Sequence, residues 1–302
     1  MTEQQPPARP QAIAAAAVIA GGIGIAYWSV LEKLVHDWSV NDNYSHGFLI
    51  APIAGYLVWE RRARIAATPV RPSWVGLAIV LAGLVTLAGG VLGVELFLTR
   101  ISLILVLAGI VVFMAGWRHL RIVSFPIAFL LLMIPIPMII FNEIAFPLQL
   151  LASRFGETAL WALHIPVLRQ GNIITLANTS LEVAEACSGI RSLVSLLTLN
   201  ILYAYFSEPR RSVQLLLVAL TVPIAILTNG LRVAAIGIAA SNYGRQSAEG
   251  AFHTVSGWLV FVAAMGLIVL VHRVIRFFLS SSTPKLPGIA ADATPSVSRG
   301  QC

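Results

Sequence analysis

Charge is scarce in this sequence. Of its 302 residues only 11% are charged and 58% are hydrophobic, whereas a soluble domain has about 25% charged and about 45–50% apolar residues. This shortage excludes an ordinary soluble domain and indicates a protein whose solvent is lipid. The net charge of +7 does not indicate nucleic-acid binding, because the basic residues stand in short clusters between apolar runs and form no basic face.

Cysteine is also scarce, and familiar metal and nucleophile motifs are missing. The two cysteines, Cys187 and Cys302, fit no disulfide framework and no zinc-binding spacing, and Cys302 ends a polar tail as an incidental thiol. The sequence has no His-Glu-x-x-His motif, no Gly-x-Ser-x-Gly motif, no phosphate-binding loop and no paired intramembrane aspartates. We therefore expect no metal and no cofactor, and Cys187 is the single internal thiol.

Long hydrophobic runs are abundant, and they predict an all-α integral membrane protein, a bundle of about eight transmembrane helices. The first run is long enough to span a membrane and is expected to be a retained span rather than a cleaved signal peptide. The expected spans are residues 12–31, 45–59, 74–94, 101–117, 122–140, 190–206, 212–240 and 254–279. The second run is short, and whether it crosses fully is open.

The predicted membrane domain covers residues 12–279. Residues 1–11 and 280–302 are expected to be cytoplasmic tails, the second of them disordered, because most basic residues fall on the side that holds both termini. The largest segment on the other side, residues 141–189, is expected to contain a small amphipathic helix followed by a β-hairpin.

Cys187 is predicted to stand where this extracytoplasmic segment enters the sixth span. A thiol at a helix N-terminus is favoured as thiolate, the nucleophilic form. On position alone, a buried structural cysteine fits equally well.

Arg232 lies roughly 12 Å inside the outer end of the seventh span. A charge at that depth costs about 2.5–3.5 kcal/mol, which favours a functional role over a snorkelling or assembly arginine. Asn229 adds a polar group to the same helix face. His253 heads the last span on the same side, where alone it would be an ordinary interfacial histidine. A thiolate, an imidazole and a guanidinium together supply a nucleophile, a general acid/base and an oxyanion stabiliser.

Five motifs occur together and in a fixed order. They are Asn-Tyr-Ser-His-Gly-Phe-Leu-Ile-Ala-Pro at 43–52, Met-Ile-Pro-Ile-Pro at 133–137, Glu-Ala-Cys-Ser-Gly-Ile-Arg-Ser at 185–192, Asn-Gly-Leu-Arg at 229–232 and Phe-His-Thr-Val-Ser-Gly-Trp at 252–258. Over residues 41–277 the chain closely resembles the exosortase/archaeosortase family.

The resemblance implies a thiol protease or transpeptidase of the bacterial inner membrane, with its active site on the periplasmic side. It implies Cys187 as nucleophile, His253 as general acid/base and Arg232 as stabiliser of the oxyanion. The implied partners are single-span exported proteins with a C-terminal PEP-CTERM-type signal, which is a Pro-Glu-Pro-type motif, a span and a basic end. Exopolysaccharide-assembly proteins are further candidate partners. The implied reaction is cleavage through a thioacyl intermediate, with transfer to an amine or another acceptor, or hydrolysis.

Supporting roles are expected for five further residues. His46 could orient substrate or assist His253, although a helix-capping role for its Asn/Ser cluster fits equally well. Arg191 or Arg245 could pair with the glutamate of the substrate motif. Ser188 and Asn229 flank the central residues. The rival hypotheses are a transporter or flippase component for lipid-linked polysaccharide and a non-catalytic scaffold, and neither gives Cys187 a role.

Overall fold

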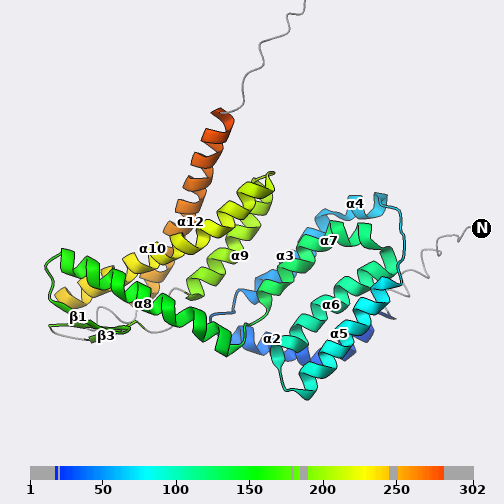
Figure 1. Ribbon diagram of the computed structural model, residues 1–302, viewed down its shortest axis with the longest axis horizontal. Helices are drawn as coiled ribbons and strands as arrows, with labels where there is room; N and C mark the ends of the chain where they lie inside the picture. The colour runs from blue at the N-terminus through cyan, green and yellow to red at the C-terminus, as the bar shows by residue number, and fades with distance from the viewer. Residues whose placement is uncertain (1–17, 20, 178–179, 184–189, 245–250, 282–302) are drawn as a thin grey trace, which may run out of the picture.

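The computed structural model describes residues 18–19, 21–177, 180–183, 190–244 and 251–281, and these are mostly helical (Figure 1). The helices of the first half are α2 (Trp28–Val40), α3 (Gly47–Glu60), α4 (Arg62–Ala67), α5 (Val75–Leu92), α6 (Leu96–Ala115), α7 (Trp117–Phe129) and the 3-10 helix η1 (Leu130–Met133). The second half contains α8 (Met138–Ala162), α9 (Ile190–Ser207), α10 (Arg211–Tyr243) and α12 (Ala251–Ser281). Between α8 and α9 lie the strands β1 (Val167–Gln170), β2 (Ile173–Leu176) and β3 (Ser180–Glu182).

The prediction of a helical membrane protein is confirmed, but the predicted count of about eight spans is not. In the described part of the chain, α5, α6, α9, α10 and residues Val255–Leu279 of α12 are long and apolar enough to cross a membrane. A sixth span results if the bent pair of α7–η1 and α8 is counted as one. The second expected span, α3, has 14 residues. The predicted tail at residues 1–11 lies outside the described residues. So do residues 282–302 of the tail predicted at 280–302, while α12 continues to Ser281.

The expected span at residues 122–140 is broken. Pro135 and Pro137 cannot continue a helix, and α8 leaves the preceding helix at an angle of 79°. The backbone groups freed by this break are bonded by side chains of an earlier segment, since the Trp38 indole N–H donates to the carbonyl of Met133 at 2.9 Å. Non-helical backbone at this depth is tolerated where such partners are supplied.

Small residues let the helices approach closely. Gly76, Gly83 and Gly90 recur at seven-residue intervals along α5 and are buried against α6. A Cβ on Gly83 would lie 2.7 Å from Cγ2 of Val106, so a larger residue has no room there. In lipid, where apolar burial between helices gains little, such close packing is the main attraction.

The predicted hairpin is confirmed and extended by a third strand. The sheet is antiparallel in the order β1-β2-β3, and Gly171 at the first turn has φ +65°, a conformation that favours glycine. Arg169 of β1 forms a salt bridge of 2.7 Å with Glu157 of α8. Ile174 and Leu176 of β2 are buried in a core shared with α8 and α10.

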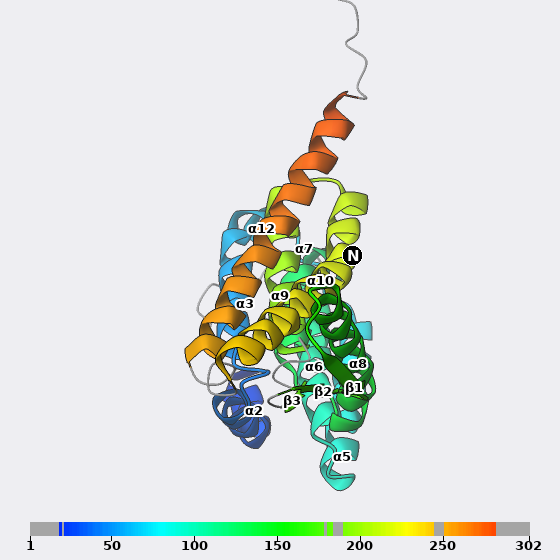
Figure 2. The ribbon, with the colours of Figure 1, turned by 90° about the vertical axis from the view of Figure 1, so that its left-hand side faces the viewer.

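The elements that precede or carry the candidate residues lie at one end of the molecule. Figures 1 and 2 place α2, α8 and the sheet at this end, and the C-terminal part of α12 at the other. Helix α9 begins, α10 ends and α12 begins at the end with the sheet (Figure 1). That Cys187 and His253 stand near consecutive helix ends on this side stays a prediction.

Candidate active site

Arg232 is held inside the helical bundle. Its side chain is 6% exposed, and it stands eleven residues before the end of α10, which corresponds to about 16 Å along the helix. The Arg232 Nε–H donates to the hydroxyl of Ser256 on α12 at 3.4 Å. Burial of this guanidinium agrees with the expectation that a charge at such depth serves a purpose.

Residues of the Asn-Gly-Leu-Arg motif contact two neighbouring helices, α8 and α12. Gly230 lies against α8, where a Cβ would come within 2.6 Å of the Phe155 ring. Asn229 is a buried side chain, 3% exposed, one helical turn before Arg232. Gly230 therefore allows α8 to approach α10 closely, while Arg232 contacts α12.

Helix α12 provides the space that the guanidinium occupies. A Cβ on Gly257 would lie 3.3 Å from Nη2 and 3.6 Å from Cζ of Arg232. Ser256 and Gly257 thus form a cradle, one by a hydrogen bond and the other by the absence of a side chain. Both stand in the 252–258 motif, but their role depends on a contact with α10 that sequence spacing does not reveal.

His253 belongs to the same face of α12. It precedes Ser256 by three residues and Gly257 by four, and residues at these separations share a helix face. The structure describes the backbone of His253 within α12. The helix that contacts Arg232 therefore carries His253 on the contacting face.

Cys187, Ser188 and Arg245 lie outside the described residues. The nearest described residues around Cys187, Val183 and Ile190, are both buried. Helix α9 begins at Ile190 and packs against both α10 and α12. The expected helix at residues 190–206 is confirmed as α9, while the position and the role of the Cys187 thiol stay predictions.

A buried polar contact fixes α9 to α10. The Asn200 amide donates to the Leu217 carbonyl at 2.8 Å and to the Thr221 hydroxyl at 2.6 Å. Asn200 and Thr221 are fully buried. Neither residue was predicted from the sequence, although an asparagine inside an apolar helix indicates an interhelical hydrogen bond.

Arg191, the first polar residue of α9, is engaged with an earlier part of the chain. Its Nη1 lies 3.2 Å from Oδ2 of Asp42, and its Nε–H donates to Oδ1 of Asn43 at 3.2 Å. These bonds join the start of α9, four residues after Cys187, to the turn between α2 and α3. Arg191 is therefore paired within the protein.

His46 and Tyr44, from the same turn, hold the break before α8. Nε2 of His46 lies 3.3 Å from the Leu132 carbonyl oxygen, and the Tyr44 hydroxyl oxygen accepts the Ile136 N–H at 3.2 Å. Burial lowers the pKa of His46, which stands before α3. The capping hypothesis gains no support, because the start of α3 has no side-chain cap. A supporting role for His46 stays a prediction.

Among the residues that the structure describes, no group of three or more His, Cys, Asp or Glu side chains could hold a metal ion. The arrangement of α9, α10 and α12 suits a reaction that develops negative charge beside Arg232.

Comparison with known proteins gives one finding. The family model of transmembrane exosortases matches residues 38–270, a stretch that contains all five sequence motifs. No curated protein and no solved structure matches the chain significantly. The match covers most of the sequence, and the chain belongs to the transmembrane exosortase family.

Proposed function

We propose that this protein is a membrane cysteine peptidase or transpeptidase that cleaves the C-terminal sorting signal of exported single-span proteins. Membership of the exosortase family suggests a membrane sorting protease or transpeptidase. The observation that carries the proposal is the cradle of Arg232, because it sets a buried guanidinium against the helix face to which His253 belongs. A buried cation without a reaction to serve would be an expensive feature in lipid.

In the proposed reaction the Cys187 thiolate attacks the carbonyl carbon of the scissile peptide bond. Arg232 stabilises the oxyanion of the tetrahedral intermediate. His253 gives a proton to the leaving amine, so that the C–N bond breaks and a thioester with Cys187 remains. An acceptor amine or water then attacks the thioester carbonyl, and the thiol is released.

The proposed substrates carry a PEP-CTERM-type signal, as the family resemblance implies. Such a tail has one span and a basic end, so it can lie beside the helices with its motif at the end of the molecule where α9 begins. We place this end on the periplasmic side of the bacterial inner membrane and both termini in the cytoplasm, which the distribution of basic residues supports.

Co-expression with a tagged single-span substrate tests the proposal. Cys187→Ala and Cys187→Ser should accumulate the uncleaved substrate at normal membrane levels of the enzyme, measured by gel mobility and mass spectrometry. Cys302→Ser is the matched control and should process the substrate like the wild type. Continued cleavage by Cys187→Ala would refute the proposal and leave the transporter and scaffold hypotheses standing.

The other two roles are tested in the same assay. His253→Ala and Arg232→Ala should each abolish processing. Arg232→Lys should lose most of it, since an ammonium group cannot present the planar fork of a guanidinium. Full activity of Arg232→Lys would show that only charge is needed at that position.

A further inference from the structure

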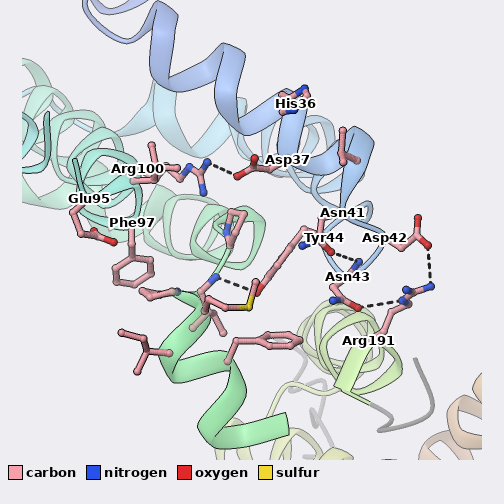
Figure 3. Close-up of a pocket in the computed structure, with 18 of the residues that line it drawn as sticks. His36, Asp37, Asn41, Asp42, Asn43, Tyr44, Glu95, Phe97, Arg100 and Arg191 are labelled. Carbon is pink, nitrogen blue, oxygen red and sulfur yellow. Dashed lines mark hydrogen bonds and ion pairs between the residues drawn. The ribbon is translucent and has the colours of Figure 1, made fainter. Parts of the chain in front are cut away.

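Two motifs have no part in the proposed chemistry, and they meet in one cavity. The cavity has a volume of about 910 Å³ and is lined by the end of α2 and the turn after it, the start of α6, the break before α8 and the start of α9 (Figure 3). Asn43 and Tyr44 come from the first unused motif. Pro135, Ile136 and Pro137 come from the second.

A buried arginine faces this cavity. The side chain of Arg100 is 3% exposed, and its Nη2 lies 2.5 Å from Oδ2 of Asp37. Its Nε is buried and has no hydrogen-bond partner among the described residues. A buried donor without a partner costs about 1–3 kcal/mol, so the described residues satisfy this guanidinium only in part, and Arg100 also lines the cavity.

The carboxylates of the cavity are already engaged. Asp37 pairs with Arg100, Asp42 pairs with Arg191, and Glu95 accepts the N–H of Leu98 at the start of α6. Three carboxylates against two arginines disfavour an anion of high charge. A single carboxylate suits the guanidinium of Arg100, because a charge-assisted hydrogen bond is about twice as strong as a neutral one.

The remaining wall is apolar and reaches the outer surface. Phe97 and Phe141 line the cavity together with the prolines of the break, a surface that suits proline and other apolar residues. Met138 and Ile139 at its rim are 62% and 79% exposed, on a surface that we place in lipid. The occupant is therefore a chain that is itself anchored in the membrane.

The cavity is connected to the candidate nucleophile through the chain. Arg191 lines the cavity and stands four residues after Cys187 (Figure 3). In Figure 3, Tyr44 lies between Arg100 and Arg191. A segment bound along this surface would lead from the buried guanidinium towards the start of α9.

We propose that this cavity binds the substrate segment next to the cleaved bond, with a carboxylate of that segment on the guanidinium of Arg100. The inference rests on the proposed function and names the recognition site within it. It names a different residue from the earlier candidates for this contact: Arg191 is held by Asp42 and Asn43, and Arg245 lies outside the described residues. Arg100 then determines specificity, while Cys187 carries the reaction.

Binding is measured with full-length Cys187→Ala protein in lipid nanodiscs, so that it does not depend on cleavage. The probe is a fluorescent single-span polypeptide with a Pro-Glu-Pro motif, and its partner carries glutamine in place of the glutamate. The glutamine should raise Kd about tenfold with Arg100 present. With Arg100→Gln the two polypeptides should differ by less than about twofold, since the contact is gone.

Two further variants guard against misfolding. Arg100→Gln leaves Asp37 without its cation, so the double variant Asp37→Asn, Arg100→Gln removes both charges together. It should show the same loss of discrimination. Arg118→Gln changes an exposed arginine of α7 and should behave like the parent protein.

The outcomes separate the two proposals. If the effects of the glutamine and of Arg100→Gln simply multiply, the cavity does not recognise the carboxylate and this inference is wrong, even where the wild type cleaves its substrate. If the cavity binds a lipid headgroup instead of the substrate, the two effects should likewise multiply. If discrimination depends on Arg100 but the wild type cleaves nothing, the recognition site stands and the proposed function fails.

Discussion

The cradle of Arg232 yields a sharp prediction through Gly257. A methyl group in place of its hydrogen would lie 3.3 Å from Nη2 of Arg232, so alanine requires a shift of a few tenths of an ångström. Valine extends about 1.5 Å further from the backbone and enters the volume of the guanidinium. The guanidinium must then move by about 1 Å, a misplacement that costs roughly 10²-fold in rate.

We therefore expect Gly257→Val to lower kcat about 10²-fold, with KM changed by less than about threefold, because Arg232 acts on the developing oxyanion. The assay is cleavage of a single-span substrate by purified enzyme in nanodiscs. Gly266→Val is the matched control, since Gly266 lies on the same helix and has nothing within 4 Å of its Cβ position. Both changes place the same β-branched residue in α12, so differences in helix propensity cancel.

Equal kcat values for the Gly257 and Gly266 variants, in proteins with the same Tm, would refute this reasoning. They would show that the guanidinium does not act where α12 holds it. If Gly257→Val alone lowers Tm, the test is made with Gly257→Ala instead. This variant should retain the fold and show a smaller loss of kcat.

Two more predictions concern stability. Gly83→Leu should lower Tm by several degrees because its Cβ would lie 2.7 Å from Val106, whereas Gly89→Leu on the same helix, with open space around it, should not. Burial alone would raise the pKa of Glu208, but hydrogen bonds from the Arg210 N–H and His272 hold it below its usual 4.5. The stability from Glu208 is then complete above pH 4.5 and is lost as the pH falls below it, so the Tm difference between wild type and Glu208→Gln should shrink in acid.

The sequence predicts the long apolar helices well and their polar boundaries poorly. The span expected at residues 74–94 is α5, Val75–Leu92, and the span expected at 190–206 is α9, Ile190–Ser207. The span expected from residue 101 starts earlier, at Leu96. Arg100 therefore lies inside α6 rather than outside the span, and Asp37, 63 residues away, pairs with it inside the fold.

The same limit applies to the site. Residue type and depth were enough to single out Arg232, because an intramembrane charge is costly and indicates a functional residue. Ser256 and Gly257 were not recognised. A glycine in an apolar helix can have several structural roles, and only the contact with Arg232 identifies the role of Gly257. The span expected at residues 122–140 runs through Pro135 and Pro137 without a break. The sequence does not reveal the break, because the side chains that bond its backbone lie some ninety residues away.

Two buried arginines now have different partners, and the difference assigns them different tasks. Arg232 donates to the hydroxyl of Ser256 and lies against Gly257, so we expect α12 to position it for a charge that develops during the reaction. Arg100 shares its charge with Asp37 and offers its guanidinium to a group that is already charged on arrival. Interactions that appear only in the transition state raise kcat, and interactions present throughout lower KM. Loss of the first arginine should therefore reduce kcat, and loss of the second should raise KM.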